Sequence, residues 1–208
     1  MQIHRGWGLL ALLLAVGALS APAFAQQPAA ETPPAAALPA AAKHHKHKHA
    51  AEPAEAVAGG TKPTLLGQYG DWGAYTASPG GKKICFAIAK PSSSETNPPN
   101  RPRNPAYMFI SSRPGDKVSN EISVIIGYPF KSSTDATLAV GSATFALYTQ
   151  QDGAWIKDAA EEPRLVEALR ASQSAVVRGT STKGTRSTDI FSLKGLAQAL
   201  DRSDRDCK

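Results

Sequence analysis

The stretch Ile122-Ser123-Val124-Ile125-Ile126 decides the fold class of this 208-residue chain. Isoleucine and valine are β-branched residues, which are enriched in strands. A dense run of them is typical of a strand in the middle of a sheet, where both faces are buried. The stretch therefore predicts a central strand over residues 121–128.

Short apolar runs surround this strand from Leu65 onward, and Gly, Pro, Ser and Asn residues separate them. In residues 83–90, for example, Ile84, Phe86 and Ile88 share one face, and such alternation is typical of strands. The other predicted strands are residues 70–76, 107–112, 137–140, 143–148, 154–157, 175–180 and 189–193. Nine short strands predict a mainly β, sandwich-like single domain, with a partly closed barrel as the alternative.

Two short helices interrupt the strand pattern. Residues 161–170 place aliphatic side chains at helical spacing, with acidic residues early and Arg170 late, which complements the helix dipole. A second helix is predicted to begin near Ser192 and to continue towards Cys207, because leucines and an alanine recur on one stripe.

Five prolines lie between residues 91 and 105, together with Arg101 and Arg103. Proline cannot donate a hydrogen bond to a strand ladder. This segment is therefore predicted to be a long loop with no sheet-forming content.

Residues 1–25 follow the pattern of an export signal. A basic start precedes an apolar run over residues 9–19, and small residues at Ala23 and Ala25 suit cleavage before Gln26. The run is shorter than the ~20 residues that a membrane-spanning helix needs. We expect a cleaved signal peptide, no transmembrane span and a location in the periplasm, with outer-membrane association and secretion as alternatives.

Residues 26–63 form a low-complexity arm that contains 13 alanines and 6 prolines. Such a composition cannot bury enough apolar surface to fold, so the arm is predicted to be disordered, and residues 64–208 form the folded domain. Its middle carries His44, His45, His47 and His49, interleaved with lysines. Three interpretations stay open: a solvated tether, a contact with a polyanion, or a site for weak binding of Cu, Ni or Zn.

Cys85 and Cys207 are the two cysteines of the chain. In an oxidising compartment an even pair predicts a disulfide, here one that fastens the C-terminal helix to the strand over residues 83–90. A redox pair is the alternative, but such pairs usually lie in C-x-x-C on one turn. The spacing therefore favours a structural bridge.

The folded domain has few of the residues and motifs that enzymes use for catalysis. It contains no histidine, which excludes a Ser-His-Asp or Cys-His site and a histidine-ligated zinc inside it. No serine lies in G-x-S-x-G or S-x-x-K. The paired carboxylates at Glu161 and Glu162, and at Asp204 and Asp206, lie among charges that explain them without catalysis. We expect no catalytic residues and no cofactor beyond the metal option of the arm.

Residues 179–185 imitate a phosphate-binding loop, but Thr185 stands directly after Gly184 where a lysine is required. A β-hairpin with a Lys-Gly turn is the better interpretation, and Lys183 and Arg186 would leave its tip positive. The domain has 18 Lys and Arg against 14 Asp and Glu and lacks an aromatic-basic motif, so no nucleic-acid partner is expected.

Several stretches together resemble the invasion-associated locus B family of exported alphaproteobacterial proteins. They are Gly70-Asp71-Trp72, the run over residues 122–130, Phe145-Ala146-Leu147-Tyr148, Ala154-Trp155 and the tail over residues 165–207 with Asp189-Ile190-Phe191-Ser192-Leu193-Lys194-Gly195-Leu196. Many members carry a cysteine where Tyr75 and Thr76 stand here, and this departure favours the pairing of Cys85 with Cys207.

The resemblance implies a compact β domain associated with the cell envelope and, in some pathogens, with host-cell entry. It implies no catalytic residues. The leading hypothesis is an exported, non-enzymatic cell-envelope binding module, whose partner is an envelope or host-surface protein or a polyanion. The alternative is a periplasmic metal-binding or metal-buffering protein that acts through the histidines of the arm.

Overall fold

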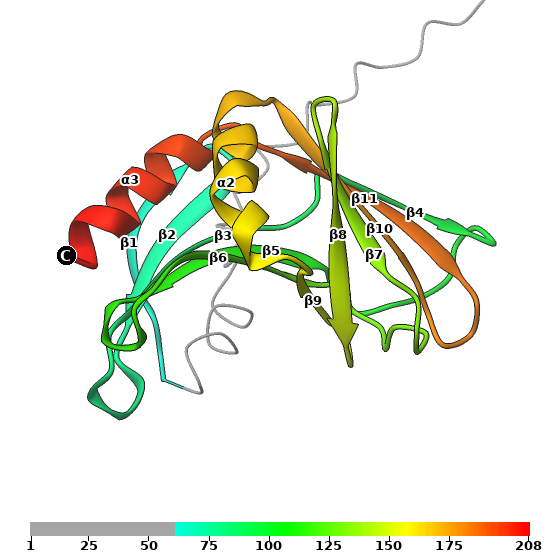
Figure 1. Ribbon diagram of the computed structural model, residues 1–208, viewed down its shortest axis with the longest axis horizontal. Coiled ribbons are helices and arrows are strands. Elements are labelled where there is room, and N and C mark those ends of the chain that lie inside the picture. The colour runs from blue at the N-terminus through cyan, green and yellow to red at the C-terminus, as the bar shows by residue number, and fades with distance from the viewer. Residues whose placement is uncertain (1–60) are drawn as a thin grey trace, which may run out of the picture. The chain divides into compact units, whose positions relative to one another are not determined.

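The computed structural model describes residues 61–208. The predicted signal peptide, residues 26–60 of the arm and the four arm histidines lie outside the described residues. Within the described part, eleven strands form one antiparallel sheet in the order β1-β2-β3-β5-β6-β9-β8-β7-β10-β11-β4 (Figure 1). The prediction of a mainly β domain with two short helices is confirmed.

The strands have the following bounds: β1 Thr64–Tyr69, β2 Trp72–Ala77, β3 Ile84–Ala89, β4 Ser93–Asn97, β5 Tyr107–Arg113, β6 Val118–Ile125, β7 Ala136–Val140, β8 Ala143–Gln150, β9 Gly153–Ile156, β10 Ser174–Thr180 and β11 Arg186–Ser192. Helix α2 spans Glu162–Ala171 and helix α3 spans Leu196–Asp206. None of the helices in this part of the chain has the length and apolarity needed to cross a membrane.

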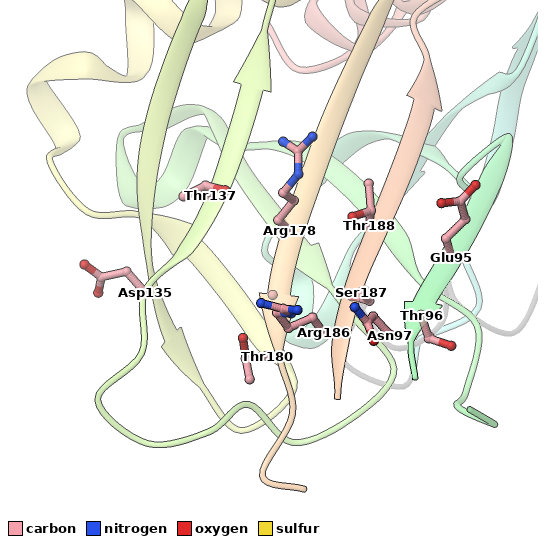
Figure 2. Close-up of a pocket in the computed structure, with 11 residues that line it drawn as sticks. Glu95, Thr96, Asn97, Asp135, Thr137, Arg178, Thr180, Arg186, Ser187 and Thr188 are labelled. Atoms are coloured by element: carbon pink, nitrogen blue, oxygen red, sulfur yellow. The ribbon is translucent and has the colours of Figure 1, made fainter. Parts of the chain in front are cut away.

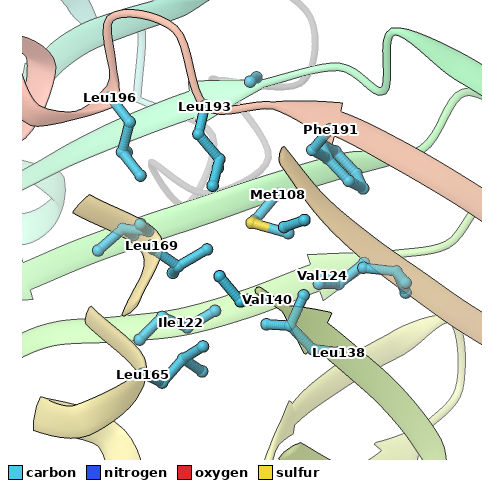
Figure 3. Close-up of a cluster of buried hydrophobic side chains, with 14 of the residues drawn as sticks. Met108, Ile122, Val124, Leu138, Val140, Leu165, Leu169, Phe191, Leu193 and Leu196 are labelled. Atoms are coloured by element: carbon cyan, nitrogen blue, oxygen red, sulfur yellow. The ribbon is translucent and has the colours of Figure 1, made fainter. Parts of the chain in front are cut away.

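The two halves of the sheet pack against each other across one core, which makes the domain sandwich-like. Ile122 and Val124 of β6 belong to the same buried cluster as Leu138 of β7 and Phe191 of β11 (Figure 3). The alternation in the central strand thus points every second side chain into this core. The isoleucine-rich stretch that predicted a central strand is buried at Ile122, Val124 and Ile126.

Both helices bury an apolar stripe in the same core. Leu165 and Leu169 of α2 are fully buried, as is Leu196 at the start of α3. Helix α3 begins three to four residues later than the predicted start near Ser192, because β11 extends through Ser192. Gly195 caps the helix with a φ of 91°, and a Cβ there would lie 1.9 Å from the carbonyl oxygen of Tyr69. Only glycine fits this turn.

Two strands were not predicted, and both lie at an edge of the sheet. The prediction of a loop over residues 91–105 is wrong for β4, which pairs with β11 at Thr188↔Glu95. The sequence of β4, Ser-Ser-Glu-Thr-Asn, has no apolar alternation because its side chains are exposed or half-buried. The strand β1 was missed for a related reason, since an edge strand needs less apolar sequence than a central one.

The disulfide between Cys85 and Cys207 is present, with a Cα–Cα distance of 5.9 Å and a sequence separation of 122 residues. It fastens the end of α3 to β3. The predicted pairing thus joins the two elements that the sequence analysis named, although the partners lie far apart in the chain.

Candidate functional site

A buried ion pair holds the proline-rich segment against the hairpin of β10 and β11. Asp189 of β11 is 0% exposed, and Arg103 donates from Nη1 to its Oδ2 at 2.8 Å. The second guanidinium nitrogen, Nη2, pairs with Oδ1 of the same carboxylate, which also accepts a hydrogen bond from Ser94 Oγ at 2.7 Å. Arg103 also donates to the carbonyl oxygen of Ile126 at 2.9 Å. This pair fastens β4 and the loop that follows it to β11.

A tyrosine extends this polar network beneath the hairpin. The hydroxyl of Tyr128 lies 2.7 Å from Ser187 Oγ, and the guanidinium of Arg103 lies 5.9 Å from the centre of the Tyr128 ring. Burial raises the pKa of Tyr128 above its ordinary value, so the phenol keeps its proton at neutral pH. Because the charges of Arg103 and Asp189 are buried and hydrogen-bonded, this network stabilises the fold rather than providing a reactive group.

The outer face of the same strands carries a row of polar side chains. This row consists of the cross-strand neighbours Thr137, Arg178, Thr188 and Glu95. A second row consists of Thr180, Arg186 and Asn97. These residues line a cavity of about 440 Å³ on β7, β10, β11 and β4. Figure 2 shows Arg178 between Thr137 and Thr188, with Arg186 on the neighbouring strand.

The two arginines of this cavity have no acidic partner among the residues that the structure describes. Within residues 61–208, no carboxylate oxygen lies within 4.0 Å of a guanidinium nitrogen of Arg178 or Arg186. Of the two acidic residues that line the cavity, Asp135 is held by Lys157 at 2.7 Å. Glu95 is the remaining acidic side chain there, so the cavity keeps an excess positive charge.

A second cavity of about 470 Å³ lies beside the first and shares Thr96 with it. Arg101 and Lys183 line it, together with the turn of the hairpin. Lys131 lies close by, since its backbone nitrogen donates to the carbonyl oxygen of Thr180 at 2.9 Å. We call the whole region the basic hairpin end and define it by Arg101, Lys131, Arg178, Lys183 and Arg186.

These five basic side chains form no ion pair with any carboxylate of the described chain. Guanidinium groups beside threonine hydroxyls can donate several hydrogen bonds to one phosphate, sulfate or carboxylate group. The arrangement is therefore suited to binding anionic groups. Among residues 61–208, no set of three or more His, Cys, Asp or Glu side chains is placed to hold a metal ion.

Sequence reasoning found part of this region and missed the rest. It placed Lys183 and Arg186 at a positive hairpin tip, and the hairpin of β10 and β11 is present. Arg178 and Arg101 were missed, because their proximity depends on the pairing of β4 with β11. The buried pair had one signal: Asp189 alternates with Ser187 and Phe191, so it points into the core and needs a partner there.

Residues 72–204 match the family described as "Invasion associated locus B (IalB) protein". The crystal structure of invasion associated protein b from Bartonella henselae has 17% sequence identity and a TM-score of 0.48, covering 67% of this chain and 94% of that chain. No curated protein matches the chain.

Proposed function

The chain belongs to the invasion associated locus B (IalB) family, and on this premise we propose that it is an exported, non-enzymatic binding protein of the cell envelope. The export-type leader and the disulfide support a location outside the cytoplasm, because disulfides persist in oxidising compartments. The periplasm is the proposed location, with association to the outer membrane or secretion as alternatives.

The unpaired charge of the basic hairpin end carries the proposal. A basic side chain without an acidic partner usually adds little stability, and five such side chains without a partner in the described chain repel one another. An anionic ligand would remove this repulsion and accept hydrogen bonds from the guanidinium groups and the threonine hydroxyls. The same region therefore gives affinity and a steep dependence on salt.

The proposed ligand is a polyanionic chain of the envelope or of a host surface. Arg178 and Arg186 line one cavity, Arg101 and Lys183 line the neighbouring one, and Thr96 borders both. A single small anion contacts one of these cavities, whereas a chain that bears repeated anionic groups can contact both. Multiple contacts of this kind add up to useful affinity even when each contact is weak.

The test measures binding of heparin and of polyphosphate by calorimetry. We expect the double variant Arg178→Gln/Arg186→Gln to bind at least about tenfold more weakly than wild type, with a shallower dependence on salt. The matched control is Arg205→Gln/Lys208→Gln, which removes the same charge from the end of α3 and should change affinity less than about twofold. Equal losses in the two double variants, or no binding of either probe by wild type, would contradict the proposal.

A second candidate function rests on the arm, outside the described residues. Four imidazoles within residues 44–49 can bind Cu, Ni or Zn when they are neutral, although the interleaved lysines oppose tight binding. The test titrates each metal into wild type and into a variant with His44, His45, His47 and His49 changed to alanine. Equal weak binding by the two proteins would exclude the metal function.

A further inference from the structure

A separate cavity of about 320 Å³ lies on the face of β1, β2, β3 and β5 that points away from the main core. The register pairs Gln68 with Gly73 and Gly73 with Ile88, so these three residues share this face. By strand alternation Tyr75 lies on the same face as Gly73 and Ile88. Lys90 and Tyr107 complete the wall at the ends of β3 and β5.

Gly73 forms the floor of this cavity and allows an aromatic ring to lie on it. A Cβ at Gly73 would lie 2.6 Å from Cε2 of Tyr75 and 3.1 Å from Oε1 of Gln68. The Tyr75 ring also stacks on Phe86, with a centroid distance of 5.5 Å and an interplanar angle of 12°. The ring is therefore held in place from below, and its open edge faces the cavity.

Tyr75 adds a polar group to the wall of this cavity, its hydroxyl. Tyr75 is 7% exposed as a whole, but its hydroxyl is not one of the fully buried polar atoms that lack a hydrogen bond among the described residues, so solvent reaches it. Burial raises the pKa of Tyr75, so the hydroxyl remains protonated and can both donate and accept. The hydroxyl can therefore exchange a hydrogen bond with water for one with a ligand in the cavity.

The rim of the cavity adds groups of complementary chemistry. Gln68, Asp71 and Lys90 are exposed there, and neither charged residue has an ion-pair partner within 4.0 Å among residues 61–208. The ammonium of Lys90 lies 5.5 Å from the centre of the Tyr107 ring. One carboxylate and one ammonium cancel in net charge, which sets this cavity apart from the basic hairpin end.

We propose that this cavity binds a single neutral sugar ring, with the apolar side of the sugar against Ile88 and the edge of Tyr75, and its hydroxyls on Gln68, Asp71 and Lys90. A pyranose has an apolar C–H face and a rim of hydroxyls that donate and accept hydrogen bonds. Ile88 and the edge of Tyr75 offer an apolar surface, and the carboxylate, the amide and the ammonium offer hydrogen bonds to the hydroxyl rim. The cavity also falls in the size range of small-ligand sites. This inference does not rest on the proposed polyanion site, which uses other residues.

The test uses saturation-transfer NMR on the purified protein with the methyl glycosides of glucose, galactose, mannose and N-acetylglucosamine as probes. We expect at least one glycoside to receive saturation at its ring C–H protons when the protein aromatic protons are irradiated. Gln68→Ala and Asp71→Asn should each weaken the binding of that glycoside by roughly five- to tenfold, because each variant removes a hydrogen-bonding partner. Asp152→Asn, which changes a carboxylate in the turn between β8 and β9, is the matched control and should leave binding unchanged.

A third variant, Gly73→Ala, places a methyl group against the Tyr75 ring and should abolish transfer, with circular dichroism used to check the fold. The exposed variant Gln68→Ala keeps the test decisive if Gly73→Ala disturbs the strand. The proposal fails if no glycoside receives saturation at concentrations up to roughly 50 mM, well above a millimolar Kd. It also fails if transfer persists unchanged in both Gln68→Ala and Asp71→Asn.

Discussion

The two ends of the sheet differ in how their elements are joined and in where ion pairs form. At the end formed by β1, β2, β3 and β5 with α3, which we call the clamped end, two basic residues that join neighbouring elements have acidic partners. Lys83 pairs with Asp206 at 3.4 Å, and Arg113 pairs with Glu121 at 2.8 Å. At the basic hairpin end, the five defining bases have no such partner in the described chain, and the ion pair between Arg103 and Asp189 beneath them is buried.

The difference separates charges that support the fold from charges that are available to a ligand. At the clamped end, the disulfide and the ion pairs join α3 and the loops to the strands. At the basic hairpin end, the buried ion pair between Arg103 and Asp189 joins the loop after β4 to β11. The basic side chains on the outer surface of the hairpin are therefore available to bind a ligand.

The largest effect on stability should come from removing the disulfide at the clamped end. We expect Cys85→Ser/Cys207→Ser to lower the free energy of unfolding by about 4 to 5 kcal/mol, because the bridge closes a loop of 122 residues in the unfolded chain. Urea denaturation of oxidised wild type and the double variant measures the loss. Hydrogen exchange should also show α3 opening before β6 in the variant. A double variant as stable as wild type would refute a structural role for the bridge.

The second effect should come from the buried pair at the other end. We expect Asp189→Asn to lower the free energy of unfolding by about 3 to 5 kcal/mol, because it leaves the Arg103 charge buried without its counter-ion. Arg103→Met/Asp189→Leu replaces both charges by apolar groups and should regain most of this loss. Denaturant unfolding of the three proteins checks both statements. A double variant that is less stable than Asp189→Asn would contradict this account.

The parts of the fold that follow from local pattern were predictable from sequence. The alternation around Ile122 and the helical spacing of Leu165 and Leu169 gave strands and a helix close to the observed ones. The edge strand β4 was not predictable in this way, because Ser-Ser-Glu-Thr-Asn buries no apolar face. Its pairing is decided by tertiary contacts, including that of Ser94 with Asp189.

In the candidate site too, residues close together in the sequence were predictable, and residues brought together only by the fold were not. Lys183 and Arg186 were found because they are neighbours of one turn in the sequence. Arg101 joins them only through the fold, since it lies some eighty residues earlier in the chain. The cavity of Tyr75 was missed for the same reason: Gln68, Gly73 and Ile88 share a face only once the strand register is known.

The third prediction compares single bases from the two ends. Arg113→Gln removes a guanidinium that bonds both oxygens of Glu121, and it should cost up to about 1 kcal/mol of stability. Arg186→Gln removes one without a partner in the described chain and should change stability by less than about 0.5 kcal/mol. Thermal unfolding of both variants measures the difference. Similar losses would show that the hairpin arginine also supports the fold.

The smallest effect concerns a carboxylate at the start of α2, between the two ends. Glu162 accepts a hydrogen bond from the backbone nitrogen of Ile122 at 3.1 Å, and burial raises its pKa above the ordinary value of 4.5. The folded state therefore binds the proton more tightly than the unfolded state, so this residue lowers stability as pH rises from below 4.5 through the folded pKa.

Glu162→Gln removes this dependence while keeping an oxygen that can accept from Ile122. The variant should match wild type near about pH 4 and exceed it by a few tenths of a kcal/mol at about pH 7, because solvent screens this half-buried group. Urea unfolding at the two pH values measures the difference. If the advantage of the variant instead grows on acidification, the carboxylate is stabilised in its charged form. Arg113 would then outweigh burial, and the ion pairing of the clamped end would extend to the start of α2.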